Sequence, residues 1–147
     1  MHLAFKRIAG AAGAVIVLAG FASAAHGDSP ANAPGQGMLC MWALISGAAE
    51  AGDRCFTGKD QAFQAQLHDL VAKMDAYAAK NGPATPDQIA GFHQDQGLRG
   101  TPTTALCQGE APKFYTHLRD AIGPVKVRTM VESMIARPGK PTWDTCV

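Results

Sequence analysis

Four cysteines spread over most of the chain constrain its fold more than any other feature. They are Cys40, Cys55, Cys107 and Cys146. Disulfides form and persist in oxidising compartments, so the meaning of these cysteines depends on whether the chain is exported. An even number of cysteines in an exported chain most simply means structural disulfides, which here would be two.

The N-terminus has the three parts of a secretory signal peptide. Two basic residues precede an apolar run over residues 8–22, and small residues follow up to Ala25. This run is shorter than the ~20 apolar residues that a membrane-spanning helix needs. We therefore predict that residues 1–25 are removed on export and that the protein works in the periplasm or the medium. A retained membrane anchor is the alternative.

The remaining chain has the length of one domain and no marked charge. Residues 26–37 contain prolines and glycines but almost no large apolar side chain, which predicts a flexible leader before a single domain over 38–147. The whole chain has 13 Lys and Arg against 12 Asp and Glu; without Lys6 and Arg7 the count is 11 against 12, a net charge of −1. The charges are interspersed, so nucleic acid and anionic membranes are poor partners. The expected partner is another protein of the cell envelope.

The spacing of the cysteines narrows their pairing. No C-x-x-C motif occurs, so a redox pair, a zinc knuckle and haem attachment have no support. If residues 38–50 form a helix, Cys40 lies about 15 Å from its end, because a helix rises about 1.5 Å per residue. The few residues before Cys55 would then have to run back nearly straight. We favour the pairings that join Cys40 and Cys55 separately to Cys107 and Cys146, with metal-binding or reactive thiols as the alternative.

Apolar residues recur at spacings of three and four along the chain, and no stretch alternates as a strand would. The pattern predicts an all-α fold, a small bundle of about five short helices with two disulfides. The expected helices cover residues 38–50, 57–81, 85–97, 112–122 and 125–137, with one short helical turn possible in the loop over 98–111. Residues 138–147 are expected to form an irregular strap in which Trp143 covers the edge of the core and Cys146 anchors the tail.

Three histidines border the apolar faces of three different expected helices. They are His68, His93 and His117. Imidazole binds zinc and copper, so a small metal-handling protein is one alternative function. No pair such as H-x-x-x-H fixes two of them on one face, however, and packing or surface roles account for single histidines at such borders. We predict no metal site and no cofactor.

Catalytic motifs are missing from the sequence. Ser46 lacks the surrounding G-x-S-x-G elbow of a nucleophilic serine, and no glycine-rich phosphate loop occurs. Glu50, Glu110 and Glu132 could supply a pair of carboxylates, but their spacing fixes no distance between them. We therefore assign no catalytic residue. A hydrolase of unfamiliar type, using a histidine with Glu50 or Glu132, is a further alternative.

Residues 44–50, Leu-Ile-Ser-Gly-Ala-Ala-Glu, are followed by Cys55. This segment resembles part of the small periplasmic immunity proteins that neutralise injected toxins. The resemblance covers residues 40–75 at most, and the later half of the chain departs from that pattern, so no family is assigned. It implies one instance of the function that we predict, a non-enzymatic binding or interaction module outside the cytoplasm, for example an inhibitor.

Overall fold

The computed structural model describes residues 33–144, and the secondary structure in this part of the chain is helical, which confirms the all-α prediction. The predicted signal peptide and Cys146 lie outside the described residues. The elements are α1 (Met38–Cys55), α2 (Gln61–Asn81), α3 (Pro86–Asp95), α4 (Thr103–Gln108), α5 (Ala111–Thr116), the π-helical segment η1 (His117–Ile122) and α6 (Pro124–Ile135). Within residues 33–144, none of these helices has both the length and the apolar character needed to cross a bilayer.

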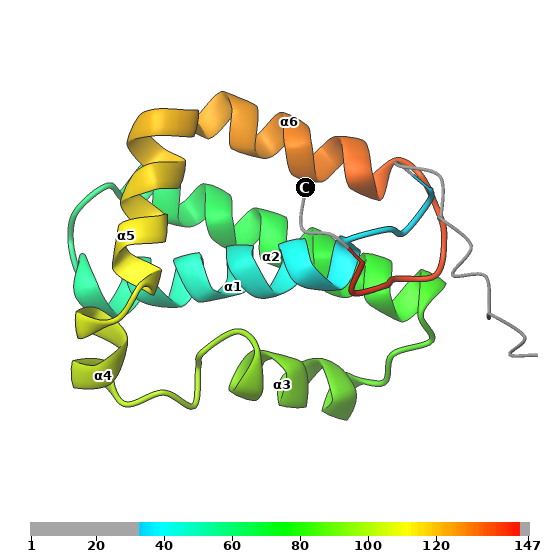
Figure 1. Cartoon of the computed structure of the whole chain (residues 1–147), viewed down its shortest axis with the longest axis horizontal. Coiled ribbons are helices and arrows are strands. Elements are labelled where there is room, and N and C mark those ends of the chain that lie inside the picture. The colour runs from blue at the N-terminus through cyan, green and yellow to red at the C-terminus, as the bar shows by residue number, and fades with distance from the viewer. Residues whose placement is uncertain (1–32, 145–147) are drawn as a thin grey trace, which may run out of the picture.

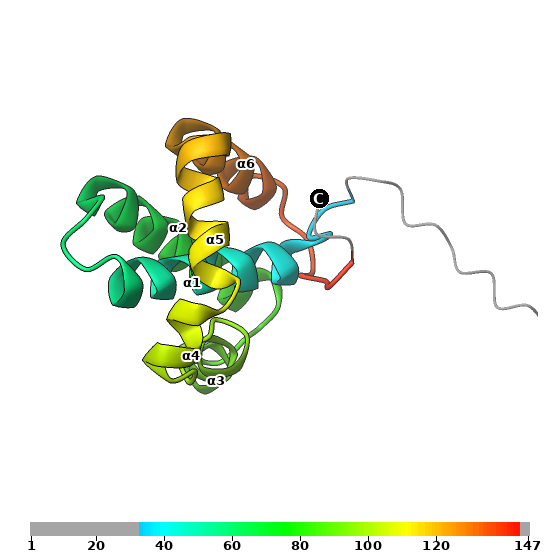
Figure 2. The same ribbon diagram turned by 60° about the vertical axis from the view of Figure 1, so that its left-hand side comes forward.

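Helix α1 lies at the centre of the bundle. It contacts α2, α3, α4 and α5, while α6 packs on α2 (Figure 1). Two groups of helices therefore flank α1, with α2 and α6 on one side and α3 and α4 on the other. Helix α5 crosses one end of α1 and, through η1, connects the two groups (Figure 2).

Helix α1 is longer than the sequence pattern predicts. It continues through Gly52 to Cys55 instead of ending near residue 50. Gly52 is a point of close approach, because a Cβ atom at this position would lie only 2.8 Å from the Tyr115 ring. The Gln64 side-chain amide donates to the Gly52 carbonyl at 3.0 Å and so covers the end of α1. Gly52 thus lets α5 pack against α1.

The predicted start of α3 near residue 85 is confirmed, and that of α2 is wrong. At α3 a capping box forms: Thr85 Oγ1 accepts from the Gln88 amide at 3.3 Å, and Gln88 Oε1 accepts from the Thr85 amide at 2.9 Å. Helix α2 does not begin at Thr57, whose hydroxyl donates to the Asp53 carbonyl in the last turn of α1. It begins at Gln61, because residues 56–60 form the turn that reverses the chain between α1 and α2.

The helix predicted over residues 112–122 is divided. Its first part is α5, and from His117 the backbone widens into the π-helical segment η1, where the Gly123 amide donates to the Leu118 carbonyl at 3.0 Å, five residues back. A π-helical turn is rare and is frequently found at functional sites. The short helical turn expected in the loop over 98–111 is present as α4.

The core forms between α1, α2 and α6, and Tyr115 of α5 and Leu118 of η1 are buried in it. Its largest side chains with less than 2% exposure are Tyr115, Met38, Ile45, Leu67, Leu70, Met74, Leu118, Val127 and Val131. Burying an aliphatic side chain of this size contributes roughly 1.5–3 kcal/mol. This apolar contact stabilises the arrangement of α1, α2 and α6.

A disulfide joins Cys55, the last residue of α1, to Cys107 in α4, with the two Cα atoms 5.5 Å apart. This bond belongs to one of the two pairings favoured from the sequence. Because Cys40 and Cys55 lie on the same continuous helix, they are about 22 Å apart along its axis and cannot bond to each other. Of the two disulfides predicted, this is the one present within residues 33–144; the other requires Cys146.

The C-terminal strap is irregular, as predicted, and it packs against the beginning of α1 and the end of α2. The Tyr77 hydroxyl lies 2.8 Å from the Gly139 carbonyl and 3.0 Å from that of Arg137. The Thr142 amide donates to the Gly35 carbonyl at 3.0 Å, so the strap lies beside the described end of the leader (Figure 1). Trp143 covers less of the core edge than predicted, because 53% of this residue is exposed. Its ring lies beside that of Phe92, with the ring centroids 6.0 Å apart.

Candidate functional site

An apolar cavity of about 590 Å³ lies between α1, the segment after α3 and α5. We refer to it as the apolar cavity. Its lining comprises Ala43, Leu44, Gly47, Ala48, Gln96, Leu98, Glu110, Ala111, Lys113, Phe114 and His117. The cavity thus occupies the side of α1 that faces away from α2 and α6, and its wall includes the first residue of η1.

The size and lining of the apolar cavity suit a small molecule. Sites for small ligands typically have volumes of about 300–1,000 Å³ and mostly apolar walls. Water in the cavity mostly faces carbon atoms of residues such as Leu44, Leu98 and Phe114. Because such water lacks hydrogen-bond partners, an apolar molecule can displace it favourably.

One wall of the cavity depends on a close contact between Gly47 and Leu98. A Cβ atom at position 47 would lie 3.2 Å from Leu98 Cδ1, so the glycine allows Leu98 to approach α1. Leu98 itself has φ 64°, in the left-handed region that residues with a branched side chain rarely adopt. Strained backbone of this kind persists only where the surrounding structure fixes it, and it gathers at ligand sites.

Polar side chains surround the mouth of the cavity. Lys113 Nζ donates to Glu110 Oε1 at 2.8 Å, and both side chains are largely exposed. Gln96 and His117 are exposed as well, and neither side chain forms a hydrogen bond with another residue in the described chain. The rim therefore offers one ion pair and, at Gln96 and His117, two further groups that can donate and accept hydrogen bonds.

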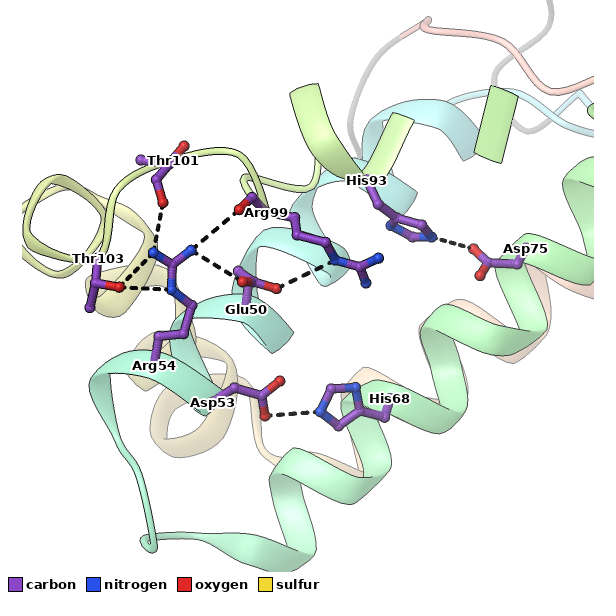
Figure 3. Close-up of polar contacts among 9 residues, drawn as sticks. All are labelled: Glu50, Asp53, Arg54, His68, Asp75, His93, Arg99, Thr101 and Thr103. Atoms are coloured by element: carbon purple, nitrogen blue, oxygen red, sulfur yellow. Dashed lines mark hydrogen bonds and ion pairs between the residues drawn. The ribbon is translucent and has the colours of Figure 1, made fainter. Parts of the chain in front are cut away.

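A smaller, polar pocket of about 50 Å³ lies on the other side of the same segment, between α1, α2 and α3. Two histidine–carboxylate pairs lie beside it (Figure 3). His68 Nε2 is 2.9 Å from Asp53 Oδ1, and His93 Nε2 is 2.9 Å from Asp75 Oδ1. The histidines therefore bind two separate carboxylates, without a shared centre.

Asp75 connects three helices. Its Oδ1 atom accepts from Trp42 Nε1 on α1 at 2.8 Å and lies within hydrogen-bond distance of the buried His93 on α3. The Trp42 ring also stacks on Phe92, with centroids 3.8 Å apart. A buried polar group is costly without a partner, so the carboxylate supports the packing of α3 on α1 and α2. His93 has a structural role in this arrangement.

Arg54 anchors the segment between α3 and α4 to α1. Its Nη2 atom donates to the Thr101 carbonyl and to Thr103 Oγ1, both at 2.7 Å, and its Nη1 atom donates to Glu50 Oε1 at 3.1 Å (Figure 3). Arg99 also faces Glu50, at 3.9 Å. Since Cys55 is the next residue, the guanidinium and the disulfide act on the same segment, which bears Gln96 and Leu98 at the wall of the apolar cavity.

The three histidines singled out in the sequence do not converge. His68 and His93 line the polar pocket, whereas His117 lines the apolar cavity. Among residues 33–144, no group of three potential metal ligands comes together. The alternative of a metal-handling protein, which required all three imidazoles, therefore has no geometric basis in this part of the chain.

The carboxylates considered for hydrolysis are also separated. Glu50 lies in the polar pocket near two histidines, but its carboxylate is bound by Arg54. Glu132 lies on α6, where Lys73 Nζ of α2 donates to it at 2.7 Å. Glu110 is at the rim of the apolar cavity. Within residues 33–144, Glu50 and Glu110 line different pockets, and Glu132 lines neither of these two.

The sequence pattern missed the apolar cavity, because no motif marks its residues. Two local signals were present. Leu98 is a single apolar residue in the polar segment Gly97-Leu98-Arg99-Gly100, and residues 46–49 of α1 are all small. A lone leucine in a loop, opposite a helix face without large side chains, is compatible with a cavity, but sequence alone does not bring the two together.

The chain matches no protein-family model, no curated protein and no solved structure. The resemblance of residues 44–50 to immunity proteins therefore remains a hypothesis. The geometry of the described residues carries the functional argument.

Proposed function

We propose that this chain is an exported, non-enzymatic binding module whose ligand occupies the apolar cavity. The observation that carries the proposal is the cavity itself, about 590 Å³ in volume and lined mostly by apolar surface, while its polar lining residues Gln96, Glu110, Lys113 and His117 are all exposed. This combination is typical of a site for a small molecule.

The cavity is also organised in advance of binding. The Cys55–Cys107 disulfide and the Arg54 hydrogen bonds fix the segment that forms one wall. A wall that is already fixed needs little ordering when the ligand binds, and binding is stronger for that reason. These interactions support a binding role without requiring any reactive group.

A small molecule fits better than a protein partner. In residues 33–144, the large apolar side chains that are exposed are Val125 and Trp143, and neither lines the cavity. Interfaces with proteins usually have an apolar patch that extends over the surface. Here the apolar surface lies inside the concavity. An inhibitor of immunity type, acting through a protein partner, is therefore the less favoured form of the proposal.

Export and a second disulfide complete the proposal. We expect residues 1–25 to be removed and the protein to act in the periplasm or the medium. Cys40 is not a free thiol, and Cys55 and Cys107 are bonded to each other, which supports a Cys40–Cys146 bond. Intact mass spectrometry of the exported protein, before and after reduction and alkylation, tests both points. Four alkylated cysteines without prior reduction, or a retained leader, would contradict them.

Binding can be tested with N-phenyl-1-naphthylamine, a neutral apolar dye whose fluorescence rises in apolar surroundings. We expect saturable binding of one dye per chain. Ala43→Phe should abolish it by filling the cavity, because Ala43 is a half-buried lining residue. The matched control is Ala72→Phe, at an exposed alanine of α2 outside the cavity. Dye binding that is absent, or that survives Ala43→Phe in a folded variant, overturns the proposal.

A further inference from the structure

The rim of the apolar cavity indicates which chemical class of ligand it accepts. We infer that the ligand is a neutral amphiphile, with its apolar part inside the cavity and an uncharged head group, such as a hydroxyl or amide, at the rim that includes Gln96 and His117. The inference rests on the proposed function and adds the chemistry of the head group.

The charged groups at the rim offer little to a charged ligand. Lys113 and Glu110 already bind each other at 2.8 Å, with 73% and 84% of their side chains exposed. Ion pairs that are this exposed contribute little to binding, because water screens both charges. An anionic head group would have to compete with Glu110 for Lys113, and a cationic one with Lys113 for Glu110. Neither charge is therefore favoured by the rim as a whole.

The two remaining polar groups have unused hydrogen-bonding capacity. Gln96 follows α3 and His117 begins η1, so the groups come from different walls of the cavity. Neither side chain bonds to another residue of the described chain. The side-chain amide of glutamine and the imidazole ring of histidine are both groups that can donate and accept hydrogen bonds. A hydroxyl or an amide can donate to one and accept from the other, whereas a carboxylate can only accept.

The apolar part of the wall offers no hydrogen-bond partner to the ligand. The walls of the cavity combine small residues on α1, such as Ala43 and Gly47, with the side chains of Leu44, Leu98 and Phe114. These side chains carry no polar atom, so nothing inside the cavity can bind a second polar group of the ligand. The polar part must therefore be at one end of the ligand, at the mouth.

Three probes with the same chain length test the head group. We would measure how 1-decanol, decanoate and decyltrimethylammonium displace N-phenyl-1-naphthylamine. We expect 1-decanol to bind roughly tenfold more tightly than either ion, about the effect of two additional hydrogen bonds. In the double variant Gln96→Ala/His117→Ala this preference should disappear, while binding of the dye is retained.

The outcomes separate the two proposals. If no probe displaces the dye and the dye itself does not bind, the proposed function fails. If the dye binds but the three probes compete equally, the cavity binds ligands and the inference about the head group is wrong. It is also wrong if decanoate binds best and Lys113→Ala removes that advantage, since Lys113 would then bind the head group. Ala72→Phe should behave as the unsubstituted protein throughout.

Discussion

The two sides of α1 are held by different kinds of interaction. On the side of α2 and α6 the contact is apolar, and α2 alone buries six side chains, among them Leu67, Leu70 and Met74. On the opposite side, α3 buries only His93 and α4 only Leu106. There the Cys55–Cys107 disulfide, the Arg54 hydrogen bonds and the Asp75 carboxylate connect the helices.

This difference explains how a bundle of this size can keep a large cavity. A filled core stabilises one side, where every lost side chain leaves a void. The other side has few buried apolar groups, so covalent and polar anchors replace the missing packing and keep the walls apart. Removing the two kinds of interaction separately should therefore have different consequences.

The largest effect is expected on the side of α1 that packs against α2 and α6, which we call the filled side. Leu70 is fully buried within the core, so Leu70→Ala should lower the free energy of unfolding by about 3–5 kcal/mol. The matched change is Leu106→Ala in α4. Leu106 is 2% exposed but lies outside the main core cluster, and we expect a smaller loss of about 2 kcal/mol. Urea denaturation measures both values, and equal losses would contradict the distinction between the two sides.

Removing the disulfide should affect the other side first. The bond closes a sequence separation of 52 residues, and its loss in Cys55→Ala/Cys107→Ala should lower the free energy of unfolding by about 2–4 kcal/mol. Hydrogen exchange should increase in α3 and α4 before it increases in α2 and α6. Uniformly faster exchange over the whole chain would show that the disulfide stabilises the bundle as one unit. In that case the side of α1 that carries α3 and α4, which we call the open side, would have no separate stability.

Substituting Arg54 tests the polar anchor alone. Arg54→Lys keeps the charge but loses the planar group that reaches Thr101, Thr103 and Glu50 together. We expect a loss of about 1–2 kcal/mol in the free energy of unfolding, with faster hydrogen exchange confined to residues 96–103. Binding of N-phenyl-1-naphthylamine should weaken as well, because this segment forms one wall of the apolar cavity. Full dye affinity in Arg54→Lys would show that the wall does not need this anchor.

The sequence predicts the filled side much better than the open side. Apolar residues at helical spacing identified α1, α2 and α6, because burial of a continuous stripe is a local property of the sequence. The start of α3, on the opposite side, is also predicted correctly, because the capping box at Thr85 is formed by residues close together in the sequence. On the filled side, by contrast, α2 does not begin at residue 57, since the Thr57 hydroxyl is used by the preceding helix and no propensity reports such competition.

The open side depends on contacts between residues distant in sequence. Arg54 binds Thr101 and Thr103 across more than forty residues, and nothing near Arg54 in the sequence indicates these partners. The left-handed conformation of Leu98 is imposed by its surroundings, because its own preference opposes it. Two of the three histidines have carboxylate partners that their spacing did not suggest. The cavity follows from these contacts and so could not be predicted.

The smallest effect is expected from the exposed ion pairs between α2 and α6. Lys73 Nζ lies 3.0 Å from Asp69 and 2.7 Å from Glu132, and these hydrogen bonds lower the pKa of both carboxyl groups. The unfolded chain therefore takes up protons before the folded chain as the pH falls. The contribution of Glu132 to the free energy of unfolding is complete at neutral pH and is lost as the pH falls below 4.5, its ordinary pKa, and passes through the lowered value.

Glu132→Gln should thus be slightly less stable than the unsubstituted protein at pH 7, and the difference in melting temperature should vanish on acidification. A difference that persists at low pH would mean that Glu132 stabilises the contact of α2 and α6 by packing instead of by its charge.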